Sequence, residues 1–275
     1  MASTRAQTFT IAHARTVIRA ATATDDKYSR GVVGLCTGSA TYPGAAVLGV
    51  EGAWRAGAGL VRYVGAAPDL VLARRPETVT VTGRCDAWVV GSGQTREDAV
   101  AAGTTELLVG ETPVVADAGA LELVDCPHAL TVVTPHAGEF ARLAAHHSIA
   151  LTPDTEANVV AMATALRVVV VLKGSRTLVA SPGTPNVWSI DVETPWLATA
   201  GTGDVLAGMM GSVIAQVRPT THEELARAAA TAVFLHSRAG ELAAAHGSAV
   251  PHPIVALDVA AAAPTAVAEV LGGTA

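Results

Sequence analysis

The sequence predicts an α/β fold with a mostly parallel central sheet and helices on both faces. Short runs of β-branched residues alternate with longer alanine-rich segments, as in strand–helix–strand units. The chain is 50% hydrophobic but only 4% aromatic, which favours helices packed closely on a sheet over a bulky aromatic core. Its 275 residues contain no linker rich in proline, serine or charge. We therefore expect a single domain over residues 1–275, although the length would also allow two small domains.

The predicted strands are continuous apolar runs, which indicates burial on both faces of the sheet. In chain order they are Trp88–Val90, Pro113–Ala116, Thr131–Thr134 and Val168–Leu172. A helix of small residues is expected to precede them, ending near Arg55. Four more helices follow the same alternation, one of them started by Thr152-Pro153-Asp154: Gly138–His146, Asp154–Leu166, Asp204–Gln216 and Glu223–Ala245.

Composition and charge exclude several function classes. The net charge is −6 and there are no runs of Lys or Arg, which argues against a nucleic-acid or anionic-membrane surface. Residues 1–15 lack the apolar core of a signal peptide, and charged residues, histidine or proline interrupt the alanine-rich stretches. Cys36, Cys85 and Cys126 form no CxxC pair, which is typical of reduced thiols. We expect a soluble, cytoplasmic protein.

The chemically distinctive residues follow the predicted strands. In an open α/β sheet, ligands bind beyond the carboxyl ends of the strands. The residues expected at that edge are Gly91-Ser92-Gly93, Asp117, Thr134-Pro135-His136, Lys173-Gly174 and the loop Gly201–Asp204. Their convergence predicts a single site.

The loop Ala200-Gly201-Thr202-Gly203-Asp204 leads directly into an apolar helix. Free backbone N–H groups at such a helix start would bind an anion, and Asp204 would act as a base on a hydroxyl beside it. The alternative is an ordinary N-capping aspartate. The functional interpretation predicts phosphoryl transfer or chemistry derived from it.

Lys173 comes directly after a buried strand and is followed by Gly174, Ser175, Arg176 and Thr177. These groups could hold nucleotide phosphates, with Lys173 as a point charge and Arg176 as a bidentate fork. The alternative is a strand that ends in solvated charges before a hairpin into Leu178–Ala180. The spacing is not that of a P-loop.

Three further features have both a functional and a structural interpretation. His136 could bind a polar substrate, or simply lie at a helix start with Glu139 in the first turn. The small residues from Gly38 to Ala46 permit close approach of a flat ligand or of a neighbouring helix. Asp117 could contact a ligand or a metal-bound water, or only end its strand. His146, His147, His222, His236 and His246 are given structural roles.

No His, Cys or Asp cluster has metal-ligand spacing. We therefore expect no protein-held metal, although nucleotide phosphates normally bring Mg²⁺ with them.

In this order, the motifs resemble the NAD(P)H-hydrate dehydratase family of the ribokinase-like superfamily. The matching segments run from about Gly34 to Ala245 and comprise Tyr42-Pro43-Gly44-Ala45-Ala46, Ala56–Val61, Thr134-Pro135-His136 with Gly138-Glu139-Phe140, Leu172-Lys173-Gly174 and Gly201–Gly208. The Gly-Asp loop is shared by many ribokinase-like kinases, whereas the first and third segments together are more specific.

The resemblance implies a lyase that restores NADH or NADPH from its hydrated S form at the expense of ADP, or of ATP, with Mg²⁺. It places the substrate near Ala45, Gly93, His136 and Asp204, with Asp204 as the catalytic base. It places the adenine nucleotide along Lys173, Gly174, Ser175, Arg176 and Thr177 and at Gly201, Thr202 and Gly203. It further implies a homo-oligomer, possibly a tetramer, and dependence on a separate NAD(P)H-hydrate epimerase, because no epimerase domain is expected before Gly34.

Two turns depart from the family pattern. Its GPGLG turn reads Gly91-Ser92-Gly93-Gln94-Thr95 here, and its Gly-Asn-Pro-Gly reads Glu193-Thr194-Pro195-Trp196. Two alternatives to the dehydratase therefore stay open. One is a ribokinase-like kinase of a vitamin-precursor alcohol, and the other is a nucleotide-binding protein without activity.

Overall fold

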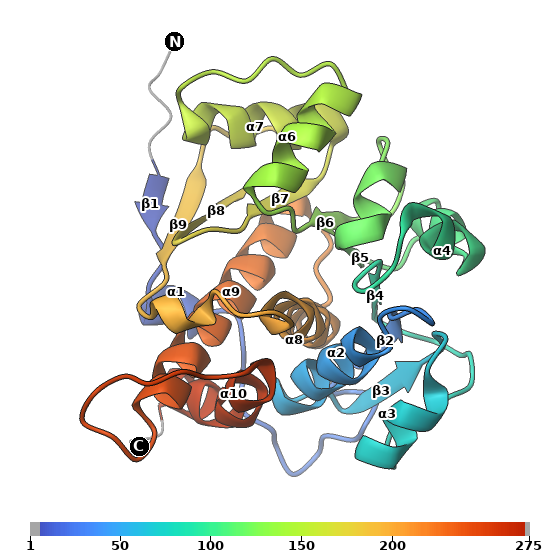
Figure 1. Cartoon of the computed structure of the whole chain (residues 1–275), viewed down its shortest axis with the longest axis vertical. Coiled ribbons are helices and arrows are strands. Elements are labelled where there is room, and N and C mark those ends of the chain that lie inside the picture. Colours follow the sequence, from blue (N-terminus) through green and yellow to red (C-terminus); the bar gives the residue numbers. More distant parts are fainter. Residues whose placement is uncertain (1–5, 273–275) are drawn as a thin grey trace.

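The computed structural model describes residues 6–272, which form a nine-stranded sheet with helices on both faces (Figure 1). The strand order is β1-β9-β8-β7-β6-β5-β4-β2-β3. Pairing is antiparallel at β7–β8 and β8–β9 and parallel at the other six junctions. The strands are β1 (Ala6–Thr8), β2 (Val32–Cys36), β3 (Leu60–Tyr63), β4 (Ala87–Val90), β5 (Val114–Ala116), β6 (Thr131–Val133), β7 (Val169–Leu172), β8 (Arg176–Ala180) and β9 (Val187–Asp191). The predicted fold class is confirmed.

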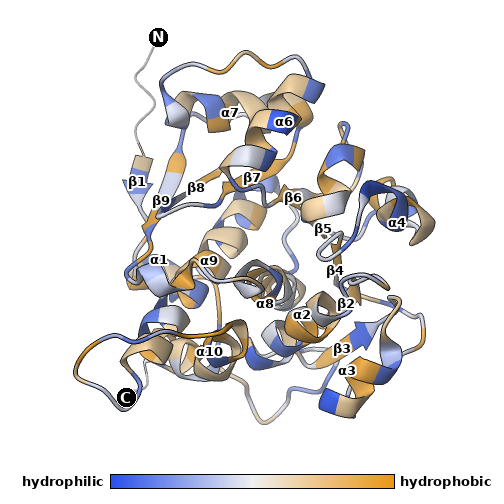
Figure 2. Ribbon diagram, viewed as in Figure 1, coloured by the Kyte–Doolittle hydropathy of each residue, from blue (hydrophilic) through white to orange (hydrophobic). Residues whose placement is uncertain are grey.

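The helices divide into two layers with separate apolar cores (Figures 1 and 2). One layer packs on one face of the sheet and contains α2 (Gly44–Arg55), α8 (Thr202–Val217), α9 (His222–Ala245) and α10 (Ala256–Val270). The other contains α4 (Arg96–Ala101), α5 (Thr104–Leu108), α6 (Ala137–His146) and α7 (Thr155–Leu166). The short α1 (Ile11–Ala14) and α3 (Pro68–Arg74) and two 3₁₀ turns, Ala118–Leu123 and Pro195–Leu197, complete the described elements.

The four predicted strands and the five predicted helices are present, with ends that differ by one or two residues. The difference at α8 matters most. This helix begins at Thr202, and its N-cap is Gly201 with φ +88°, a conformation that favours glycine. Asp204 therefore lies inside the first turn, and the interpretation of Asp204 as an ordinary N-cap is wrong.

Strands β1, β2, β3 and β9 and helix α10 were not predicted from the sequence. Two of these strands lie at the edges of the sheet, and β1 has only three residues. Helix α10 contains Pro264 in its interior, a residue type that disfavours the interior of a helix. Such short or interrupted segments depend on pairing and packing with distant parts of the chain rather than on local pattern.

Helices α2 and α8 approach each other so closely that only glycine fits between them. A Cβ atom added to Gly208 would lie 1.9 Å from the Gly49 carbonyl oxygen, and one added to Gly52 would lie 2.3 Å from that of Val205. The small-residue helix thus packs against a neighbouring helix, as one of its two interpretations required. This contact brings the first turn of α8 beside the loop that precedes α2.

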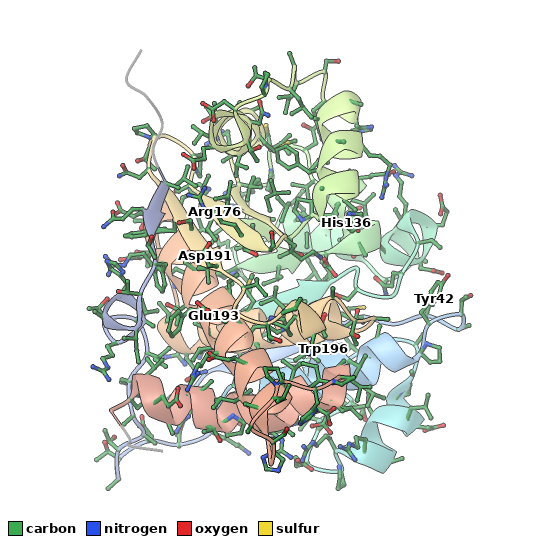
Figure 3. All side chains as sticks on the ribbon, turned by 60° about the vertical axis from the view of Figure 1, so that its left-hand side comes forward. Tyr42, His136, Arg176, Asp191, Glu193 and Trp196 are labelled. Carbon is green, nitrogen blue, oxygen red and sulfur yellow. The ribbon has the colours of Figure 1, made fainter. Side chains whose placement is uncertain are left out.

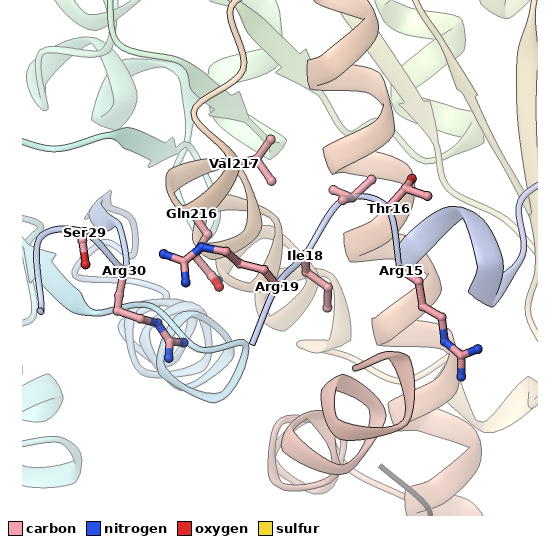
Figure 4. A pocket seen from close by; sticks show the side chains of 9 residues that line it. Arg15, Thr16, Ile18, Arg19, Ser29, Arg30, Gln216 and Val217 are labelled. Atoms are coloured by element: carbon pink, nitrogen blue, oxygen red, sulfur yellow. The ribbon is translucent and has the colours of Figure 1, made fainter. Parts of the chain in front are cut away.

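Arginines tie the segment before β2 to the ends of distant helices. Arg15 donates to the Val270 carbonyl oxygen at the end of α10 (3.1 Å), and Arg30 donates to that of Gly57 just after α2 (2.8 Å). Cations are favourable at helix C-termini. Both arginines, with Arg19, line a cavity of about 430 Å³, but their guanidinium groups point in different directions (Figure 4). Arg19 is already paired with Asp25 at 2.7 Å.

None of the helices described is both long enough and apolar enough to cross a membrane. Cys36, Cys85 and Cys126 are free thiols.

Candidate active site

The carboxyl ends of β4, β5, β6 and β7 bring the predicted site residues to one edge of the sheet. The Lys173 N–H donates to the Pro135 carbonyl oxygen (2.9 Å), so the turn before His136 and the end of β7 continue the sheet pairing. Asp117, directly after β5, contacts side chains that follow β4, β6 and β7. Ser92 and Lys173, which are 81 positions apart in the sequence (173 − 92), thereby contact the same carboxylate.

A cavity of about 710 Å³ opens at this edge. It lies between the β7–β8 turn, the segment after β9, and the starts of α6 and α8, with α9 as one wall. Its lining is mostly apolar, with a few polar groups that converge, which is typical of small-molecule sites. The polar and charged lining residues are His136, Lys173, Ser175, Thr177, Thr194, Thr199, Thr202, His236 and Ser237.

The first turn of α8 forms one end of the cavity and presents free N–H groups. Thr202 fixes the loop, because its hydroxyl bonds the carbonyl oxygens of Leu197 and Thr199, each at 2.9 Å. The Val205 N–H returns to the Gly201 carbonyl, whereas the N–H groups of Gly203 and Asp204 take part in no hydrogen bond within residues 6–272. Unpaired N–H groups at a helix start bind anions.

Asp204 is a partly buried carboxylate that accepts no hydrogen bond from any residue that the structure describes. Burial raises the pKa of Asp204 to about 6, and the negative charge of Asp117 adds to this rise, while Lys173 opposes it. A carboxylate with this pKa accepts a proton more readily than an ordinary aspartate and is still ionised at pH 7.

Lys173 is held in place by Asp117. The Nζ atom lies 2.8 Å from Oδ1 of Asp117. Burial alone would lower the pKa of Lys173, but the charge and hydrogen bond of Asp117 raise it above its ordinary value. A Cβ atom added to Gly203 would lie 3.8 Å from Nζ. A fixed ammonium group therefore lies beside the first turn of α8.

His136 combines its two predicted interpretations. Its Nδ1 accepts the N–H groups of Gly138 (3.0 Å) and Glu139 (3.3 Å), and the Glu139 carboxylate accepts the N–H of His136 (2.8 Å). This reciprocal cap starts α6. An accepting Nδ1 leaves the proton of the neutral ring on Nε2. The ring is 57% exposed and lines the cavity (Figure 3).

Ala45 and Gly93 touch each other next to the cavity rather than in its wall. A Cβ atom on Gly93 would lie 2.3 Å from that of Ala45, and Gly93 has φ +66°. Gly49, one turn after Ala45, packs near the Asp204 backbone. The first turn of α8, which carries Asp204, thus lies against α2 close to Ala45, and the loop before α2 carries the exposed Tyr42 (Figure 3).

Arg176 points away from the expected nucleotide site. Its guanidinium pairs with Glu156 of α7 at 3.1 Å and does not line the cavity (Figure 3). Successive side chains of a strand face opposite sides of the sheet. Thr177, the next residue, is buried and faces the cavity. The expectation that Arg176 grips a phosphate as a bidentate fork is not supported by this geometry, and we leave Arg176 out of the site.

His236 lines the cavity, although only a structural role was predicted for it from the sequence. It is 9% exposed, and its Nε2 lies 2.9 Å from the Thr202 carbonyl oxygen, so it supports the first turn of α8. Burial lowers its pKa to about 4, which keeps the ring neutral at pH 7. Val233 and Ser237 share this face of α9. Helical spacing could have grouped the three, but nothing local showed which face meets a ligand.

The segment Glu193–Trp196 after β9, which differs from the family pattern, does not block the cavity. Thr194, Pro195 and Leu197 line it, whereas Glu193 and Trp196, labelled in Figure 3, do not. Trp196 lies in the short 3₁₀ turn and is 39% exposed. Within residues 6–272, no group of three or more His, Cys, Asp or Glu side chains could hold a metal ion.

Comparison with known proteins gives consistent matches. A family model described as NAD(P)H-hydrate dehydratase matches residues 33–258. The bifunctional NAD(P)H-hydrate repair enzyme of Mycobacterium leprae is 42% identical over 80% of this chain and 47% of its own length. The ADP-dependent (S)-NAD(P)H-hydrate dehydratase of Xanthomonas campestris is 33% identical over 78% of this chain and 81% of its own. The chain thus spans about half the length of the bifunctional relatives.

Among solved structures, the ADP/ATP-dependent NAD(P)H-hydrate dehydratase of Bacillus subtilis, co-crystallised with ATP and Mg²⁺, superposes with a TM-score of 0.83. The two share 26% sequence identity, and the match covers 98% of this chain and 100% of the other.

Proposed function

The chain belongs to the NAD(P)H-hydrate dehydratase family, and from that premise we propose that it uses ADP or ATP to convert S-NAD(P)H hydrate back to NAD(P)H. The observation that carries the proposal is the first turn of α8. There the carboxylate of Asp204, without a hydrogen-bond partner in residues 6–272, adjoins two N–H groups that are likewise unpaired in that range and the fixed ammonium of Lys173. This set can stabilise a phosphoryl group and remove a proton from a hydroxyl beside it.

The nucleotide would occupy the cavity of about 710 Å³, with its phosphates at the first turn of α8. The N–H groups of Gly203 and Asp204 would bind a phosphate, and Lys173 would contribute a point charge. Ser175 and Thr177 would line the rest of the nucleotide site, with Gly174 and Thr202 shaping it. We propose that Mg²⁺ arrives on the phosphates, which it partly neutralises.

The hydrated nicotinamide would lie on the other side of Asp204, near Ala45 and Gly93, within reach of the exposed Nε2 of His136. Asp204 takes the proton of the substrate hydroxyl as its oxygen attacks the terminal phosphorus and AMP leaves from ADP. The carbon–oxygen bond then breaks, and its electron pair leaves with phosphate, assisted by the lone pair of the ring nitrogen. Loss of a ring proton completes the removal of water. Phosphate is a much better leaving group than hydroxide, which explains the need for a nucleotide.

The test is recovery of the reduced-nicotinamide absorbance band. Hydrated NADH is incubated with folded protein, Mg²⁺ and either ADP or ATP, with Asp204→Asn as the inactive control. Recovery that requires nucleotide supports the proposal, and no recovery with either nucleotide contradicts it. A stable phosphate ester without recovery would identify a kinase, and nucleotide binding without any product would identify a non-catalytic binding protein.

Two partners belong to the same proposal. We propose that the chain forms a homo-oligomer, with a tetramer as the expected size, which light scattering of the purified protein tests directly. We also propose that it acts in the cytoplasm on the S epimer alone and depends on an epimerase for the R form. Purified R hydrate should then persist until an epimerase is added.

A further inference from the structure

Asp117 is the most completely surrounded charged group of the site, yet the proposed reaction gives it no direct part. It follows β5 and is only 4% exposed. Its Oδ1 accepts hydrogen bonds from the Lys173 ammonium (2.8 Å) and the Thr134 hydroxyl (2.7 Å), and its Oδ2 accepts from the Ser92 hydroxyl (3.0 Å). A buried carboxylate with three donors is stable in its ionised form.

We propose that Asp117 is a positioning residue: held by Ser92 and Thr134, it fixes the Lys173 ammonium beside the anion-binding turn of α8 and keeps it from pairing with the catalytic carboxylate, Asp204. This inference rests on the proposed function for the role of Asp204, but the geometry of the pair does not depend on it.

The first step of the argument is the choice of partners open to Lys173. Three carboxylates face this ammonium: Asp117 after β5, Glu139 in the first turn of α6, and Asp204 in the first turn of α8. Glu139 already accepts the N–H of His136. Asp204 has no hydrogen-bond partner among the described residues, so it is the acceptor that Lys173 would take if Asp117 were neutral. A base paired with an ammonium is a weaker base.

The second step is the electrostatic effect on Asp204. The groups that face its carboxylate are Asp117, which raises its pKa, and Lys173, which lowers it. His236 on α9 stays neutral because burial lowers its pKa to about 4. The charges of Asp117 and Lys173 therefore act in opposite directions on the pKa of Asp204. Burial is the main cause of its raised pKa.

The third step concerns Ser92, which stands where the family pattern has proline. Proline has no side-chain donor, whereas the Ser92 hydroxyl donates to Asp117 at 3.0 Å and is itself only 1% exposed. The departure at this turn thus adds a hydrogen bond to the network behind the site. The altered turn therefore does not favour the alternative of a nucleotide-binding protein without activity.

The experiment is a titration of Asp204 in the whole protein without ligands, followed by ¹³C-carboxyl NMR and assigned with Asp204→Asn. In Asp117→Asn we expect the midpoint of Asp204 to fall by about one pH unit or more, because a negative neighbour is lost and Lys173 moves closer. In the dehydratase assay, kcat should fall about tenfold or more and the acid limb of its pH profile should move to lower pH. A residue with only a structural role would lower the amount of folded protein without moving either midpoint.

Two further variants complete the test. Ser92→Ala removes one of the three hydrogen bonds that hold the Asp117 carboxylate, which loosens its hold on Lys173, and we expect a smaller shift in the same direction. Ser181→Ala is the matched control, because Ser181 is a buried serine just after β8 whose hydroxyl has no hydrogen-bond partner in the described part of the chain, and no shift is expected. If Asp117→Asn does not fold, the titration of Asp204 in Ser92→Ala tests the inference instead.

An unchanged Asp204 midpoint in the folded variants would overturn the inference. If the wild type shows no dehydratase activity, the proposed function fails, but the NMR titration still decides whether Asp117 controls Lys173. The two failures are therefore distinguishable.

Discussion

Two carboxylates in neighbouring regions of the site show how partners, more than burial, decide a role. Asp117 lies behind the site and accepts three hydrogen bonds, and although burial opposes it, Lys173 and these bonds lower its pKa. Asp204 lies at the front and accepts none within the described residues, and burial raises its pKa to about 6. One group is a permanent anion that holds a neighbour. The other can exchange a proton at physiological pH.

Substitution of Asp204 is the strongest test of this contrast, and it should have the largest effect on turnover. Replacing it with asparagine keeps the shape but removes the proton acceptor, so we expect kcat to fall by about 10²- to 10⁴-fold. Calorimetry should find ADP affinity nearly unchanged, because the N–H groups of the turn remain. Near-wild-type turnover by Asp204→Asn would show that the base lies elsewhere.

Lys173 pairs with Asp117 and its charge also acts on Asp204. Its loss should have the next largest effect, on nucleotide affinity and on stability. Lys173→Ala removes the point charge beside the phosphate site, and we expect ADP affinity to fall by about tenfold or more. It also leaves Asp117 as an unpaired buried charge, which costs about 3–5 kcal/mol of unfolding free energy. Binding calorimetry and thermal unfolding measure the two effects separately. An unchanged affinity in folded protein would move the phosphate site away from Lys173.

Stability as a function of pH sharpens the contrast between Asp204 and Asp117. Folding raises the pKa of Asp204 from 3.8 to about 6, so its stabilising effect is present below pH 4 and is lost as pH rises through 6. Asp204→Asn should therefore stabilise the protein relative to wild type at pH 8, by about 1–3 kcal/mol. The gain should shrink at pH 4. Chemical denaturation at the two pH values checks this, and an equal effect at both would contradict it.

The effect of Asp117 on folding stability depends on pH in the opposite direction. Because its pKa is lowered in the folded protein, its stabilising effect is present above pH 4 and is lost as pH falls. Asp117→Asn should therefore destabilise most at neutral pH, measured in the same denaturation series. A variant that is less stable than wild type by the same amount at every pH would point to lost packing alone.

The smallest effect on ADP affinity and stability is expected for Arg176, which contacts neither Asp117 nor Asp204. Arg176→Ala removes a half-exposed ion pair with Glu156, which contributes about 0–1 kcal/mol to stability. ADP affinity should change less than about twofold, since exposed pairs of this kind have little influence at a distance. A large loss of affinity would return Arg176 to the nucleotide site.

Much of the fold followed from local pattern. The continuous apolar runs at β4 to β7 and the long helices α7 and α9 were found because each has a strong periodic or capping signal. The edge strands and α10 were missed because the first strand, Ala6–Thr8, is largely polar, the strand Leu60–Tyr63 is interrupted by Arg62, and α10 contains a proline. They exist because neighbouring segments supply hydrogen bonds and apolar surface.

The sequence by itself determined the kind of chemistry at the site. Gly201-Thr202-Gly203-Asp204 before an apolar helix specifies an anion-binding turn with a carboxylate, since these residue types act through their own backbone and side chain. Tertiary structure alone decided how that carboxylate behaves. It left Asp204 without a hydrogen-bond partner among residues 6–272, paired Lys173 with Asp117 across 56 positions, and turned Arg176 to the opposite face of its strand. Burial and charge act through space, and a linear pattern does not encode distances between segments that meet only when the chain folds.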